Sequence, residues 1–105
     1  MYYIYMLRCA DNSIYTGITI NVERRMEEHF SKDKNCAKYT YRHTAKKLEK
    51  VWETEDRKLA SKLEYHIKQL SKLQKEQLIK NDMLLEELLG KRIESNKYKI
   101  LNNNM

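Results

Sequence analysis

The sequence predicts an α+β domain in which a small three-stranded antiparallel sheet is flanked by helices. Two segments rich in β-forming residues stand on either side of a polar stretch near the N-terminus, as in a hairpin. Further along, apolar residues recur at intervals of three and four in two segments, as in amphipathic helices. A third β-rich segment lies between these helical patterns, so the predicted core has the order ββαβαα.

Residues 2–7 and 14–19 are the predicted hairpin strands, and residues 10–13 provide the turn. A three-residue loop, 10–12, requires a left-handed residue at its end, and Asn tolerates that conformation well. We therefore predict a positive φ at Asn12.

The length of this loop decides which side chains share a face of the sheet. A three-residue loop places Leu7 opposite Tyr15 and Tyr5 opposite Gly17, so the two tyrosines lie on the same face. A two-residue turn would shift the register by one and separate them, because side chains alternate along a strand.

Asn21 is a plausible N-cap for the first helix. The residues that follow it at helical spacing place Arg25 and His29 on the inward stripe. That stripe comprises Val22, Arg25, Met26, His29 and Phe30. Residues 32–47 show no clear period, which predicts a loop.

Residues 48–54 suit a third strand, and Asp56 can cap a second helix that runs to about Leu70. Glu64 directly follows Leu63 on the buried stripe of this helix. A carboxylate there is costly without a partner or a metal ion. The apolar members of the stripe are Ala60, Leu63, Ile67 and Leu70.

The C-terminal part divides at about residue 80, so we predict a domain over 1–80 and a helical extension with a polar tail over 81–105. Ser71 can cap a helix through Lys80, with Leu73, Leu78 and Ile79 as anchors. A further helix starts near residues 81–82, and Gly90 is its predicted stop signal.

Length and composition fit one compact domain that binds polyanions. The chain has 105 residues and carries 21 lysines and arginines against 15 aspartates and glutamates, a net charge of +6. Such a field favours nucleic acid or an anionic membrane surface, although lysine-rich surfaces also promote solubility.

No apolar run reaches the roughly 18 residues of a membrane span, so we expect a cytoplasmic protein. Cys9 and Cys36 lack metal-ligand spacing and are expected to serve in packing.

Basic and aromatic residues interleave in the predicted loop. Their charges can hold a phosphate backbone while the rings stack on exposed bases, and a merely solvated loop is the alternative. Lys68, one helical turn beyond Glu64, adds a phosphate contact. The candidate nucleic-acid-binding residues are Lys38, Tyr39, Arg42, His43, Lys46, Lys47 and Lys68.

Two aromatic triplets, Tyr3-Ile4-Tyr5 and Tyr15-Thr16-Gly17, resemble the signature of the GIY-YIG nuclease superfamily. Tyr replaces the first Gly of that signature, and Thr replaces the middle Ile of its second triplet. The superfamily's arginine, eight residues after the second triplet's glycine, falls on Arg25, and its His or Tyr one turn later falls on His29. The likeness spans about residues 1–79 and is nearest to the small stand-alone bacterial members. The UvrC-like repair branch is more distant, because it has a lysine where this chain has Ile18.

The superfamily's metal-binding glutamate matches Glu64. The resemblance therefore implies hydrolysis of phosphodiester bonds in DNA, with Mg²⁺ or Mn²⁺ held by Glu64. It implies a catalytic set of Tyr5, Tyr15, Arg25, His29 and Glu64.

The resemblance also implies how these residues divide the catalytic tasks. It assigns to Tyr15 the orientation or deprotonation of the attacking water, with Tyr5 beside it, provided that a cation lowers a phenol pKa ordinarily near 10. Arg25 can supply that cation and hold the scissile phosphate in bidentate fashion.

Each of these roles has an alternative. The tyrosines can simply fill the sheet face, and His29 can be a solvated surface residue rather than a proton shuttle or phosphate donor. Glu64 can form an ion pair with Arg25 instead of holding a metal ion.

The function implied by the resemblance is that of a metal-dependent endonuclease acting on branched, nicked or single-stranded DNA in repair or recombination. A protein partner is expected to supply target specificity. The alternative is a nucleic-acid-binding module that keeps the nuclease fold but is inactive or depends on a partner.

Overall fold

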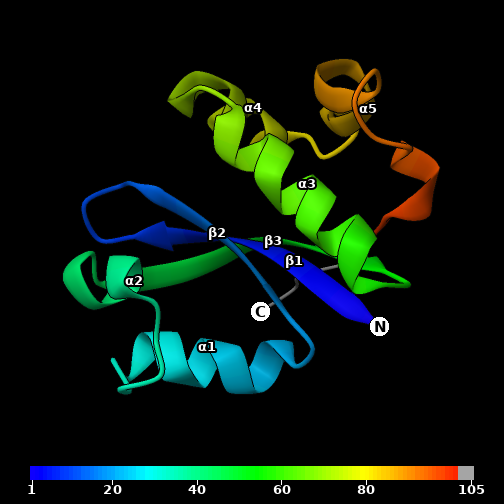
Figure 1. Ribbon diagram of the computed structural model, residues 1–105. Helices are drawn as coiled ribbons and strands as arrows, with labels where there is room; N and C mark the ends of the chain where they lie inside the picture. Colours follow the sequence, from blue (N-terminus) through cyan, green and yellow to red (C-terminus); the bar gives the residue numbers. More distant parts are fainter. Residues whose placement is uncertain (102–105) are drawn as a thin grey trace.

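The computed structural model describes residues 1–101 as a four-stranded antiparallel sheet with helices on both faces (Figure 1). The strands lie in the order β2-β1-β3-β4, so β2 and β4 form the edges. They are β1 (Tyr2–Cys9), β2 (Ile14–Thr19), β3 (Ala45–Thr54) and β4 (Lys99–Ile100). The helices are α1 (Val22–Phe30), α2 (Lys38–Arg42), α3 (Arg57–Gln69), α4 (Lys72–Lys80) and α5 (Leu84–Leu89), and a 3₁₀ turn spans Ser95–Lys97.

The hairpin has the predicted three-residue loop. Tyr5 pairs with Gly17 and Leu7 pairs with Tyr15. Asn12 has a φ of 71°, which confirms the left-handed residue at the end of the loop. Both tyrosines therefore lie on the same face of the sheet.

The three predicted helix caps are confirmed. The side chain of Asn21 accepts a hydrogen bond from the backbone of Arg24 at the start of α1. Asp56 does the same for Leu59 at the start of α3. Ser71 begins α4 with a reciprocal capping box.

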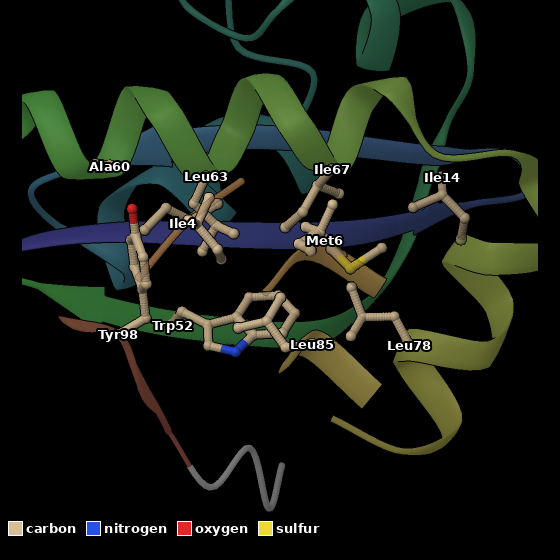
Figure 2. Close-up of a cluster of buried hydrophobic side chains, with 12 residues drawn as sticks. Ile4, Met6, Ile14, Trp52, Ala60, Leu63, Ile67, Leu78, Leu85 and Tyr98 are labelled. Atoms are coloured by element: carbon tan, nitrogen blue, oxygen red, sulfur yellow. The ribbon is translucent and has the colours of Figure 1, made fainter. Parts of the chain in front are cut away.

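The face of the sheet that carries Ile4 and Met6 packs against α3, α4 and α5 (Figure 2). Leu63 and Ile67 extend from α3 toward these strand residues, and Trp52 of β3 closes the cluster from below in this view. The opposite face carries Tyr5, Leu7 and Val51 and packs against α1 and its neighbours. Alternation along β1 thus divides one strand between two apolar clusters.

The segment after α4 packs onto the cluster that α3 covers. Leu85, Leu89, Ile93 and Tyr98 are buried in it, and the Tyr98 hydroxyl donates a 2.7 Å hydrogen bond to the carbonyl of Leu59. The chain then adds β4 to the edge of β3, so the expected sheet of three strands has a fourth. Two residues are too few to show an alternating pattern in a sequence. The last four residues of the predicted polar tail, 102–105, lie outside the described residues.

Four local predictions were wrong. Phe30, predicted on the inward stripe of α1, is exposed. The segment read as a loop contains α2, whose five residues are too few to display a helical period. The third strand begins at Ala45 rather than Leu48. Leu73, predicted as an anchor, is exposed on α4, where Leu78 is the buried residue.

Within residues 1–101, no helix combines the length and the apolar character that crossing a membrane requires. Both cysteines are free thiols, and Cys9 is buried.

Asn12 provides a direct test of the hairpin. Asn12→Ala should lower the free energy of unfolding by about 1 kcal/mol more than Asn12→Gly, because only glycine adopts positive φ without a steric penalty. Both variants lose the 2.7 Å hydrogen bond from Arg8 to the Asn12 side chain, so the difference isolates the backbone. Urea unfolding of the two variants measures it, and equal stabilities would contradict a left-handed residue here.

Candidate functional site

Tyr5 and Tyr15 lie side by side on the face of the sheet that α1 covers. Their ring centroids are 6.2 Å apart. Gly17 permits this arrangement, because a Cβ atom at residue 17 would lie 2.5 Å from the Tyr5 hydroxyl oxygen. The glycine of the second triplet therefore makes room for the tyrosine of the first.

A chain of hydrogen bonds runs from Tyr5 into α1 and α2. The Tyr5 hydroxyl lies 2.7 Å from Nε2 of His29, and Nδ1 of His29 lies 2.6 Å from Oγ1 of Thr40. Thr40 donates its own proton to the carbonyl of Ala37 over 3.1 Å. Because its one proton is used in that bond, Oγ1 of Thr40 must accept a hydrogen bond from Nδ1–H of His29. Nε2 of His29 then carries no proton and accepts a hydrogen bond from the Tyr5 hydroxyl. The chain thus assigns the Nδ1–H tautomer to His29.

Burial keeps both partners neutral. His29 is fully buried, and desolvation, followed by the charge of Arg25, lowers its pKa to about 4. Burial also raises the pKa of Tyr5 well above its usual 10, although Arg25 opposes this shift. Tyr5 is therefore a hydrogen-bond donor at neutral pH rather than a base, and the alternative of a solvated His29 is wrong.

Arg25 projects from α1 and is held in place by two partners. Its Nη1 atom donates to a carboxylate oxygen of Glu28 and to the carbonyl of Asn35, each over 2.7 Å. The guanidinium is close enough to Tyr5 to affect the pKa of the phenol. Arg25 thus brings a positive charge close to the Tyr5 phenol.

Glu64 approaches the same site from α3. Its charge also acts on the pKa of Tyr5, in the raising direction. The carboxylate lies 3.4 Å from the ammonium of Lys68, and the side chain is 23% exposed. Arg25 pairs with Glu28 instead, so the alternative of an Arg25–Glu64 ion pair is wrong.

An aromatic row leads away from Tyr15. The rings of Tyr15 and Tyr39 stack with centroids 5.5 Å apart, and those of Tyr39 and His43 stack at 4.3 Å. Nδ1 of His43 lies 2.5 Å from the carboxylate of Asp11 in the hairpin loop. The row therefore connects β2, α2 and the hairpin.

The predicted nucleic-acid-binding residues fall into two groups. Tyr39, His43 and Lys68 lie next to the tyrosine site, and the Lys68 ammonium is 5.8 Å from the centroid of the Tyr15 ring. The other four are exposed, and the ammonium of one of them, Lys47, lies 3.6 Å from a carboxylate oxygen of Glu49. These four are Lys38, Arg42, Lys46 and Lys47.

Thr40 is a site residue that periodicity and charge did not single out. It lies in a five-residue helix, and its role depends on a hydrogen bond to a residue eleven positions earlier. The available signal was its place within residues 1–79, the region that resembles the superfamily.

Glu64 is the one candidate ligand for a hard divalent cation that the predicted site offers. Residues 1–101 hold no group of three or more His, Cys, Asp or Glu side chains arranged for a metal ion. Glu64 offers one partly exposed carboxylate beside the tyrosines. Mg²⁺ commonly uses one or two carboxylates and completes its shell with water and phosphate oxygens.

Comparison with known proteins places this chain among small relatives of similar length. It is 43% identical over 88 residues to UPF0213 protein FN1575 of Fusobacterium nucleatum, covering 83% of this chain and 86% of the relative. It is 40% identical over 94 residues to UPF0213 protein CPE1444 of Clostridium perfringens, covering 89% of this chain and 98% of the relative. The solution structure of UPF0213 protein BH0048 from Bacillus halodurans has 40% identity and a TM-score of 0.49, covering 76% of this chain and 84% of that one.

The sequence pattern of the GIY-YIG catalytic domain matches residues 1–77. This match includes both triplets, α1, α2 and α3, and hence every residue of the site described above. The chain belongs to the GIY-YIG family.

Proposed function

We propose that this protein is a divalent-metal-dependent endonuclease that hydrolyses phosphodiester bonds in DNA. The observation that carries the proposal is the gathering of Tyr5, Tyr15, Arg25, His29 and Glu64 from one hairpin and two helices. Two of these groups, Arg25 and Glu64, act electrostatically on the same phenol. A phosphodiesterase needs this combination of a positioned water, a phosphate clamp and a metal-binding oxygen.

Tyr15 is the residue best placed to orient the attacking water. Its hydroxyl is absent from the chain of hydrogen bonds that occupies Tyr5, and its ring lies between those of Tyr5 and Tyr39. Arg25 neutralises charge that develops on the phosphoryl oxygens. Glu64 would hold Mg²⁺ or Mn²⁺, which supplies Lewis-acid stabilisation when bound.

Tyr5 and His29 position the catalytic groups rather than transfer protons. A neutral His29 accepts from the Tyr5 hydroxyl, and Thr40 fixes the orientation of the imidazole. The Tyr5 ring in turn packs against that of Tyr15. This arrangement restricts Tyr15 to one orientation before substrate arrives.

Lys68 exchanges partners in this mechanism. It forms an ion pair with Glu64 in the structure described here, which compensates the carboxylate charge. If Glu64 held a metal ion, the Lys68 ammonium would be free to contact a phosphate oxygen of the substrate.

One observation favours a second candidate, a nucleic-acid-binding module that is inactive or needs a partner. Glu64 is the only carboxylate among the described residues that we assign to a metal ion, and Lys68 already pairs with it. A site so poor in ligands can fail to bind the ion until substrate or another protein completes it. Such a partner would also supply target choice in repair or recombination, where branched, nicked and single-stranded DNA arise.

Cleavage assays decide between the two candidates. Purified protein with Mg²⁺ or Mn²⁺ should cut at least one of single-stranded, duplex, nicked and branched DNA, with RNA as the comparison substrate. Glu64→Gln should lower the rate about 100-fold or more, because it removes the metal-binding charge. Glu27→Gln, at an exposed position of α1, should keep the wild-type rate. Equal rates for Glu64→Gln and wild type would exclude the metal assignment, and binding without any cleavage would favour the module.

The buried His29 should make the fold sensitive to acid. Its pKa is lowered from 6.5 to about 4 in the folded protein, so below pH 6.5 the unfolded chain takes up a proton that the folded protein refuses. The free energy of unfolding should therefore fall by about 2 kcal/mol between pH 7 and pH 5 through this residue alone.

Urea unfolding of wild type and His29→Gln over this pH range isolates that contribution. His29→Gln should lose it, whereas His66→Gln, a histidine outside the hydrogen-bond chain, should retain it. The same pH dependence in wild type and His29→Gln would show that His29 is not held neutral.

A further inference from the structure

Two adjoining hollows lie along the edge strand β2 and are lined by residues of β2, of α2 and of the α3–α4 corner. Figure 1 shows how these elements are arranged. Their volumes are about 250 Å³ and about 370 Å³. Ile14, Tyr39 and Lys75 line both hollows, so they form one continuous cleft. We call it the edge cleft; its remaining lining residues are Tyr15, Thr16 and Lys68 in one hollow, and Asp11, Asn12, Ser13 and Lys72 in the other.

Three lysines form one wall of the edge cleft, and Lys75 stands at the junction of the two hollows. Lys68 pairs with Glu64, and Lys72 pairs with Glu76. Lys75 has no ion pair within residues 1–101. Burial, followed by the charges of Lys72 and Lys68, lowers the pKa of Lys75. An anion placed between the lysines would relieve this repulsion.

A network of ion pairs fixes the lysine wall against the hairpin. Arg8 of β1 donates to both carboxylate oxygens of Glu76, over 2.8 Å and 2.6 Å, and to Glu49 of β3 over 2.6 Å. The Lys72 ammonium donates to the carbonyl of Asn12 over 2.5 Å. These contacts hold α4 at the hairpin, so the cleft is formed before any ligand binds.

The other wall carries aromatic and hydroxyl groups. Tyr39 lines both hollows and stacks between Tyr15 and His43. Thr16 lines the hollow that Tyr15 also lines. Its Oγ1 is the one buried side-chain polar atom in residues 1–101 without a hydrogen-bond partner. An unpaired buried hydroxyl at a cleft wall is costly unless a ligand or water satisfies it.

We propose that the edge cleft binds an unpaired nucleic-acid strand that continues from the scissile phosphate, with Lys75 holding a backbone phosphate and Tyr39 contacting the neighbouring base. Cations on one wall and rings on the other match a single strand, which exposes its phosphates and base faces separately. A duplex stacks its bases inside and presents only phosphates to such walls. This inference rests on the proposed nuclease function, because that function places the scissile phosphate at Tyr15, where the cleft begins.

The test measures binding without cleavage. Wild-type protein in EDTA is titrated with a fluorescent oligothymidylate of about 12 nucleotides and, separately, with a blunt duplex of the same length. Lys75→Ala should weaken single-strand binding about tenfold. It should also reduce the slope of log affinity against log salt concentration by about 0.7, the value expected when one phosphate contact is lost. Lys75→Arg should retain affinity because it keeps the charge.

Lys80→Ala is the matched control, because it removes the same charge from the same helix at an exposed position outside the cleft. It should leave single-strand affinity within about twofold of wild type. Circular dichroism checks the fold of each variant, and Lys75→Gln replaces Lys75→Ala if the latter unfolds.

Three results would overturn the proposal: no binding of the single strand by wild type, equal losses for Lys75→Ala and Lys80→Ala, or equal losses of single-strand and duplex affinity at Lys75. Because the assay contains no metal ion, its outcome is independent of whether the Glu64 site supports cleavage.

Discussion

The hydrogen bond between the Tyr5 hydroxyl and Nε2 of His29 is the interaction on which the arrangement of the site depends. It joins the central strand β1 to α1 through a fully buried imidazole. Thr40 extends the connection to α2, so three elements are tied together through one histidine. Since leaving a buried partner unsatisfied costs about 1–3 kcal/mol, the bond fixes the position of each element strongly. The orientation of Tyr15, which packs on both rings, follows from it.

The same constraint explains why the two tyrosines have different chemistry. Tyr5 lies deep against α1, where desolvation and the bond to His29 keep it protonated. Tyr15 is less buried and faces the cleft shared with Tyr39 and Lys68. In our proposal, therefore, one phenol is a structural donor and the other meets the substrate. Gly17 allows Tyr5 to occupy this deep position, because any larger residue at position 17 would displace the Tyr5 hydroxyl.

Much of this arrangement could be predicted because it depends on local rules. The positive φ at Asn12 sets the loop length, and the loop length sets the face on which Tyr5 and Tyr15 meet. Helical spacing places Arg25 and His29 on one stripe of α1. Contacts between distant segments were not predictable in this way: Thr40 reaches His29 from a helix too short to show a period, and Lys68 rather than Arg25 pairs with Glu64.

The tautomer of His29 tests most directly whether this hydrogen-bond chain organises the site. Nitrogen-15 NMR of the imidazole near pH 7 should show a proton on Nδ1 and a bare Nε2 that accepts from Tyr5. Tyr5→Phe should shift the Nε2 resonance while leaving the Nδ1 proton in place. A proton on Nε2, or a doubly protonated ring at this pH, would contradict the chain and with it the proposed division of roles between Tyr5 and Tyr15.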